Sequence, residues 1–158
     1  MQLGIVDCAP RLFKSNNLFI RIVNKLPAKF KFFFFENIKK IKKRNADNAL
    51  IPTDKFYDNL NKYFIRCERN NVQKIIVIGI PFPDDRMIIK SPLIIKQVNK
   101  YNEIINNLCQ KFNNLIFICP LDARKYSYSI YEDGYHPNIK GNELVFNEIQ
   151  KILVNCQR

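Results

Sequence analysis

The sequence has little glycine, little proline and no long apolar run, and each absence excludes a class of protein. Only 4 glycines and 8 prolines occur among 158 residues, which excludes a low-complexity chain. The apolar runs are far too short to cross a bilayer. Met1 leads directly into a strand-like segment, without the basic and apolar regions of a secretory signal. We therefore expect a soluble, cytoplasmic protein that has no membrane partner.

Paired cysteines are also missing. The cysteines are odd in number and scattered, and none forms a C-x-x-C pair, which is unlike a disulfide framework or a zinc site. We therefore expect reduced, mostly buried thiols and no zinc site. The cysteines are Cys8, Cys67, Cys109, Cys119 and Cys156.

What the chain has in excess is positive charge, with a net charge of +12. A strongly basic protein can bind polyanions through phosphate contacts. However, the densest basic stretch, residues 39–44, follows the apolar run at residues 32–35, as expected at the C-terminal end of a helix. Because no recognition helix, aromatic RNA motif or zinc finger is visible, nucleic-acid binding is a minor alternative.

Three apolar segments have the pattern of buried strands: residues 2–6, 74–80 and 115–119. Each is a continuous apolar run and not an alternation, which is typical of parallel strands that are covered on both faces. The second and third runs end at Pro81 and Pro120.

Helical periodicity is present at residues 53–70, 92–112 and 138–154, and Thr53 suits the cap of the first helix. Residues 14–50 are expected to form one or two short basic helices. The apolar positions of the three helices are Phe56, Leu60, Tyr63, Phe64 and Cys67; Ile95, Val98, Ile105, Leu108 and Phe112; and Leu144, Val145, Ile149 and Ile152. Strands that alternate with helices predict an α/β fold, a three-layer α/β/α sandwich around a parallel sheet, in a single domain over residues 1–158.

The sharpest local signal is the segment Asp133–Asn138, which contains the only histidine of the chain, His136. Its Asp-Gly pair favours a tight turn, which brings a carboxylate back to a side chain three residues on. We expect Asp133 to accept a hydrogen bond from Nδ1–H of His136, which fixes the tautomer and leaves Nε2 to act as a base. Pro137 suits the start of the next helix. These flanking residues favour an acid–base pair over a histidine that merely caps or packs.

This segment resembles the final conserved block of the SGNH (GDSL-like) hydrolases, in which an aspartate and a histidine three residues apart, followed by a proline, complete a Ser–His–Asp triad. The opening segment, residues 2–7, resembles the G-x-N-D block of that family, and residues 75–80 resemble its fourth strand. The resemblance implies a flavodoxin-like fold that is N-terminally incomplete, from the third strand onward. It assigns catalysis to His136 and Asp133, and it places Gly4 in the oxyanion wall.

The chain departs from the family at two points. It lacks the G-D-S nucleophile block, and no serine lies in a suitable strand-to-helix turn, so the nucleophile is expected from outside this chain. The serines are Ser15, Ser91, Ser127 and Ser129. Val6 replaces the oxyanion asparagine, and losing one such donor typically costs about 2.7–4 kcal/mol of transition-state stabilisation. Either the backbone N–H groups nearby or Arg11 are expected to compensate; the alternatives for Arg11 are to bind an anionic substrate group or to pair with Asp7.

Two other features carry alternatives. Cys8, at the end of the first predicted strand, is either a thiolate nucleophile near His136 or, as is usual for cysteine, a buried structural thiol. The acidic pair Asp84-Asp85 and the adjacent Arg86 are expected to form a loop salt bridge or to contact substrate.

The sequence thus predicts a hydrolase of acyl esters, including carbohydrate O-acyl groups, with this chain supplying the Asp–His end of the triad. The alternative is a non-catalytic remnant or ligand-binding subunit, which Val6 favours. Because the first predicted strand lacks its neighbours, the expected partner is a complementing N-terminal polypeptide or a second copy of the chain. Alone, the chain is expected to be inactive or nearly so.

Overall fold

A computed structural model of the chain describes residues 8–10, 25, 27–28, 30–32 and 49–155. Several sequence predictions lie outside these residues, among them the first strand at residues 2–6, most of the region 14–50 and the basic stretch 39–44. The predicted site residues that lie outside are Gly4, Asp7 and Arg11, together with Val6, Ser15 and Cys156.

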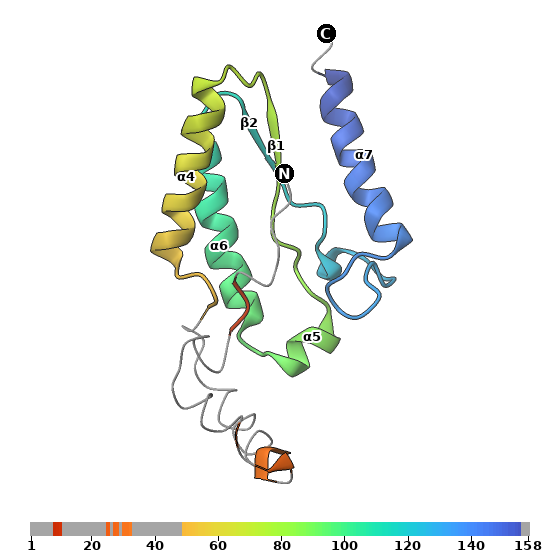
Figure 1. Ribbon diagram of the computed structural model, residues 1–158. Helices are drawn as coiled ribbons and strands as arrows, with labels where there is room; N and C mark the ends of the chain where they lie inside the picture. The colour runs from red at the N-terminus through yellow and green to blue at the C-terminus, as the bar shows by residue number, and fades with distance from the viewer. Residues whose placement is uncertain (1–7, 11–24, 26, 29, 33–48, 156–158) are drawn as a thin grey trace.

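The described part of the chain alternates helices with two short strands (Figure 1). In chain order the elements are α4 (Thr53–Arg69), β1 (Ile75–Ile78), α5 (Asp85–Lys90), α6 (Ile94–Cys109), β2 (Leu115–Ile118), the 3-10 helix η1 (Ala123–Lys125) and α7 (Ile139–Asn155). The structure therefore has an α/β fold, as the sequence predicts.

β1 and β2 are hydrogen-bonded neighbours in a parallel sheet, with Ile75 opposite Leu115 and Ile78 opposite Ile118. Both were predicted from continuous apolar runs, and both predictions are confirmed. Because the strands are parallel, their carboxyl ends lie at the same edge of the sheet. The segments that follow β1 and β2 stay together beyond the strands, since Phe82 pairs with Asp122 in an isolated parallel bridge.

Helices α4 and α6 lie side by side on one side of the strands, and α7 lies on the other side (Figure 1). Phe56, Leu60 and Phe64 of α4 and the buried face of α6 form one core cluster with the strand residues Ile75 and Val77. A smaller cluster of Leu121, Ile130 and Tyr131 packs against Leu144 and Val145 of α7. No described helix is long and apolar enough to cross a bilayer.

The helices differ from the sequence prediction in four respects. Thr53 does not cap α4, because the helix already begins there and Pro52, which has no side-chain donor or acceptor, occupies the cap position. Tyr63 was expected on the buried face but is 45% exposed, since it lies at the edge of that face with its ring against Phe64. The helix predicted at 92–112 spans Ile94–Cys109, and the short helix α5 before it was not predicted.

Candidate active site

Residues 130–138 form a closed turn between η1 and α7, and we call this segment the Asp–His turn. Asn138 N–H donates to the carbonyl of Ile130 at 3.0 Å, and Glu132 N–H donates to the carbonyl of His136 at 2.9 Å. At the tip, Gly134 has a φ of +113°, which side-chain-bearing residues rarely adopt. The sequence folds in this way because a glycine stands where the chain reverses.

The turn brings Asp133 and His136 into direct contact. Oδ2 of Asp133 lies 2.7 Å from Nδ1 of His136. Oδ1 accepts the backbone N–H of His136 at 3.0 Å and that of Tyr135 at 3.3 Å. Both carboxylate oxygens therefore have donors, and the hydrogen bond predicted from the sequence is present.

These donors also determine the charge of the pair. The Nδ1 hydrogen bond of His136, followed by its backbone N–H, lowers the pKa of Asp133 to about 2. The carboxylate is therefore ionised at neutral pH, and an anion at Nδ1 favours the tautomer that carries its proton there. Nε2 is then the basic nitrogen of the ring, and the His136 side chain is 60% exposed to solvent.

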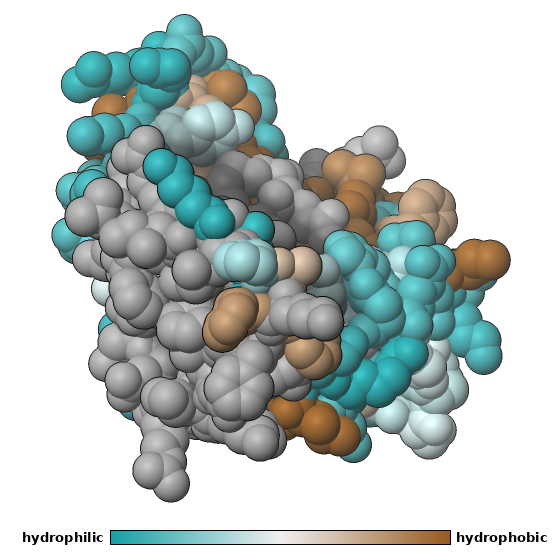
Figure 2. Space-filling model, turned by 60° about the horizontal axis from the view of Figure 1, so that its bottom comes forward, coloured by the Kyte–Doolittle hydropathy of each residue, from teal (hydrophilic) through white to brown (hydrophobic). Residues whose placement is uncertain are grey.

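The Asp–His turn is attached to the carboxyl ends of both strands. The hydroxyl of the buried Tyr131 lies 2.8 Å from the carbonyl of Phe82, which follows β1, and 3.0 Å from that of Leu121, which follows β2. Ligand and catalytic sites of open α/β sheets gather at this edge. Hydrophilic side chains cover most of the coloured surface on the right of Figure 2, which views the molecule with the lower end of Figure 1 brought forward.

The segment after β1 touches the same turn. Asp84 N–H donates to the carbonyl of Gly134 at 3.0 Å. The carboxylate of Asp84 forms an ion pair with Arg86 at 2.7 Å, so the salt bridge expected from the sequence is present, although it lies at the N-terminal cap of α5 and not in a loop. Arg86 also reaches the Asp–His turn itself, a contact that the sequence did not predict.

Two asparagines that the sequence analysis did not single out hold this region together. Asn102 of α6 is buried; its Oδ1 accepts the N–H of Ile80 at 2.7 Å, and its Nδ2 donates to the carbonyl of Ile80 at 2.9 Å. Asn138 accepts the N–H of Gly141 at 3.0 Å and donates to the carbonyl of Ser129 at 2.9 Å. A polar residue on the mostly apolar buried face of α6, where Gln97 is the other polar side chain, was the available signal for Asn102.

Gly141 allows α7 to begin close to the turn. A Cβ added at this position would lie 2.4 Å from the carbonyl oxygen of Ile130, which no side-chain-bearing residue tolerates without a backbone shift. The glycine therefore lets the first turn of α7 pack directly on the chain that leads into the Asp–His turn.

The described residues provide no nucleophile in contact with His136. Ser129 donates its hydroxyl to the carbonyl of Tyr131 at 2.7 Å, and Ser91 occupies the C-terminal cap of α5. Cys8 is fully buried within the main core cluster, in agreement with a structural thiol. Among the same residues, no group of three or more side chains is arranged to hold a metal ion.

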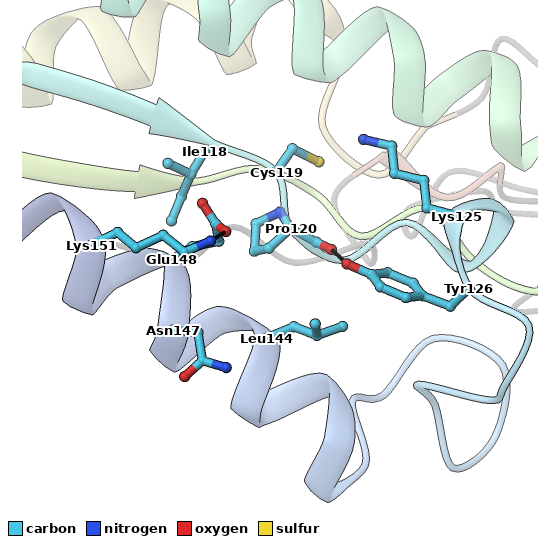
Figure 3. A pocket seen from close by; sticks show the side chains of 9 residues that line it. All are labelled: Ile118, Cys119, Pro120, Lys125, Tyr126, Leu144, Asn147, Glu148 and Lys151. Atoms are coloured by element: carbon cyan, nitrogen blue, oxygen red, sulfur yellow. Dashed lines mark hydrogen bonds and ion pairs between the residues drawn. The ribbon is translucent and has the colours of Figure 1, made fainter.

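A separate cavity of about 420 Å³ lies between α7 and the segment that follows β2 (Figure 3). Leu144 and Pro120 face it from opposite walls, and the ion pair of Glu148 with Lys151, at 2.6 Å, borders it. Neither Asp133 nor His136 lines this cavity. It is therefore distinct from the Asp–His turn.

No family model, curated protein or solved structure significantly matches this chain. Its class is therefore defined by the fold and the site alone: an α/β protein with an exposed carboxylate–imidazole pair at the carboxyl ends of parallel strands.

Proposed function

We propose that this protein is a hydrolase of acyl esters of the SGNH (GDSL-like) kind, in which Asp133 and His136 form the acid–base end of the active site. The observation that carries the proposal is the 2.7 Å contact between Oδ2 of Asp133 and Nδ1 of His136. It lies in an exposed turn that is hydrogen-bonded to the segments after both strands. The complete fold, in this proposal, is a three-layer sandwich, and the protein is cytoplasmic.

In this proposal His136 Nε2 removes the proton of an attacking hydroxyl group and returns it to the leaving alcohol. The Asp133 carboxylate keeps the imidazole in the required tautomer and stabilises the imidazolium that forms on proton transfer. It does not itself take up the proton. The substrates are small acyl esters, and O-acylated carbohydrates are the first group to screen.

The serine nucleophile is supplied from outside the described residues. A complementing N-terminal polypeptide is the source that we propose, and a second copy of this chain is the alternative source. The attacking hydroxyl group must come within hydrogen-bond distance of the base. Nε2 of His136 is accessible to such a group, because it belongs to an exposed ring. We propose no metal or organic cofactor, since the triad chemistry needs none.

The test is ester hydrolysis by the protein purified natively from its own source, with any polypeptide that copurifies. We expect p-nitrophenyl acetate to be hydrolysed, and His136→Ala and Asp133→Asn each to lower kcat/KM at least about 100-fold, as general acid–base catalysis predicts. Glu132→Gln is the matched control, because it removes an exposed carboxylate of the same turn that does not contact the imidazole. A fluorophosphonate probe, followed by peptide mapping, then identifies the attacking serine.

Hydrolysis that depends on His136 but not on Asp133 would refute the proposal, because any exposed imidazole attacks an activated ester slowly. Absence of hydrolysis in every form of the protein would favour the second candidate, a non-catalytic ligand-binding subunit. The observation in favour of that candidate is that, among the described residues, no serine or cysteine is hydrogen-bonded to the imidazole of His136, whose ring nitrogen Nδ1 pairs with Asp133.

A further inference from the structure

Arg86 lies in the first turn of α5, the helix that follows β1. Its guanidinium bonds both to Asp84 of the same segment and to the Asp–His turn. On the first side, Nε and one terminal nitrogen donate to Oδ2 of Asp84 at 2.9 and 2.7 Å. Oδ1 of Asp84 accepts the backbone N–H of Arg86 at 2.9 Å. Asp84 therefore fixes both the backbone and the side chain of Arg86.

On the second side, the guanidinium donates to two successive backbone carbonyls, that of Glu132 at 2.7 Å and that of Tyr131 at 3.0 Å. Nη2 of Arg86, which donates to the carbonyl of Tyr131, also lies 3.4 Å from the hydroxyl of Ser129. Arginine is suited to this task because its five N–H donors form a rigid, planar fork. A single side chain thus connects the end of β1 to residues 43 to 46 positions later in the chain.

These contacts hold the backbone of the residues directly before and after Asp133. Arg86 holds Glu132, directly before Asp133, and Asp84 N–H holds the carbonyl of Gly134, directly after it. A Cβ added to Gly134 would lie 3.1 Å from Oδ1 of Asp84, so the tip of the turn also packs closely on this pair. The backbone on each side of Asp133 is therefore bonded to the same Asp84–Arg86 unit.

We propose that Arg86 is the positioning residue of the Asp133–His136 pair: by holding the carbonyls of Tyr131 and Glu132, it keeps the Asp133 carboxylate on Nδ1 of the imidazole. The role in catalysis rests on the proposed function, whereas the role in orienting the imidazole does not. Arg86 itself touches neither substrate nor the reacting atoms in this proposal.

The position of the imidazole proton can be read directly, because the chain has a single histidine. In the native protein labelled with 15N-histidine, long-range 1H–15N spectra report which ring nitrogen carries the proton. We expect the Nδ1–H tautomer in the wild type and a mixture of tautomers in Arg86→Ala. In the hydrolysis assay we expect kcat of Arg86→Ala to fall about 100-fold, the loss typical of a displacement of about 1 Å, with KM changed less than about threefold.

Arg124→Ala is the matched control, since Arg124 also forms an ion pair with an aspartate two residues earlier but, among the described residues, does not bond to the Asp–His turn. It should leave the tautomer and kcat as in the wild type. If Arg86→Ala fails to fold, Arg86→Lys serves instead: it keeps the cation but cannot span Asp84 and both carbonyls. We expect a tautomer mixture in this variant also.

An unchanged tautomer and kcat in a folded Arg86 variant would overturn the inference, even if its unfolding midpoint fell, because a purely structural role predicts that result. If the wild type shows no hydrolysis at all, the proposed function fails. The tautomer comparison then still decides whether Arg86 orients the imidazole, so the two failures are distinguishable.

Discussion

The two parallel strands are followed by segments with the same local structure but different surroundings. Each has an aspartate that accepts the backbone N–H of the arginine two residues later, at 2.9 Å in Asp84–Arg86 and at 3.2 Å in Asp122–Arg124. Each arginine also forms an ion pair with its aspartate at 2.7 Å. The spacing Asp-x-Arg therefore produces the same side-chain cap and ion pair at the start of two different helices, the α-helix α5 and the 3-10 helix η1.

The arginines differ in what they face. Arg86 bonds to the carbonyls of the Asp–His turn, whereas the guanidinium of Arg124 stacks on the ring of Phe82, 4.2 Å from its centroid. Arg124 thus packs on an aromatic ring, whereas Arg86 holds the backbone of the candidate site. The comparison shows that one local motif can have two roles, and that the role depends on the segment packed over it.

The largest effect is expected from Asn102, which bonds both backbone groups of Ile80 after β1 and also donates to the thiol of Cys119 after β2 at 3.8 Å. In Asn102→Ala, both the N–H and the carbonyl of Ile80 lose their amide partners in a buried position, and the carbonyl keeps only the weak thiol donor of Cys119 at 3.7 Å. Because an unsatisfied buried group costs about 1–3 kcal/mol, we expect the free energy of unfolding to fall by about 3 kcal/mol. Urea denaturation measures this change.

Asn107→Ala, at an exposed position on the same helix, is the control and should change the free energy of unfolding by less than about 0.5 kcal/mol. A loss below about 1 kcal/mol in Asn102→Ala would mean that water or a shifted backbone satisfies Ile80.

The strands and the turn could be predicted from the sequence because their signals are local. Ile75–Ile78 and Leu115–Ile118 are unbroken apolar runs, and Gly134 marks the reversal that brings Asp133 to His136. Helix α5 was missed because six residues with no buried side chain carry no usable periodicity. Thr53 was assigned as a cap from residue type alone, which cannot tell a cap from the first residue of a helix.

The role of Arg86 could not be predicted, because its contacts join segments that are far apart in the chain. The spacing of Asp84 and Arg86 indicates a local salt bridge, and that part of the prediction is confirmed. Nothing in the local pattern distinguishes Arg86 from Arg124, which has the same spacing from Asp122. Only the position of the Asp–His turn, set by Tyr131 and by the packing of Gly141 on Ile130, separates the two.

A smaller effect is expected from the residue that joins both loops. Tyr131→Phe removes the hydroxyl that lies between the carbonyls of Phe82 and Leu121. Both carbonyls keep a backbone donor, since Ala123 N–H donates to Phe82 and Phe82 N–H donates to Leu121. We therefore expect a loss of about 1 kcal/mol in urea denaturation, the ordinary net contribution of one hydrogen bond.

Tyr128→Phe, which alters an exposed tyrosine, is the control for this change and should leave the unfolding midpoint as in the wild type. A loss above about 3 kcal/mol in Tyr131→Phe would show that the hydroxyl, and not the backbone pairing of the two segments, holds the loops together.

The smallest effect concerns acid stability, to which the Asp–His turn and the segment after β2 each contribute a carboxylate with a lowered pKa. The Nδ1 hydrogen bond of His136 lowers the pKa of Asp133 to about 2, and the guanidinium of Arg124 lowers that of Asp122. A lowered carboxyl pKa stabilises the folded state above the ordinary value of about 4. This stabilisation is lost as the pH falls, for Asp133 between about 4 and about 2.

We therefore expect Asp133→Asn to be less stable than the wild type at about pH 5 and to converge with it towards about pH 2, in urea midpoints measured across that window. Asp122→Asn should converge in the same direction below about pH 4. Because the Asp133 side chain is half exposed, solvent screens its pair, and its difference from the wild type should be the smaller of the two. Wild-type and Asp133→Asn curves that run parallel through this window would mean that the carboxylate is not bound to the imidazole in solution. The contact on which the candidate active site depends would then be absent.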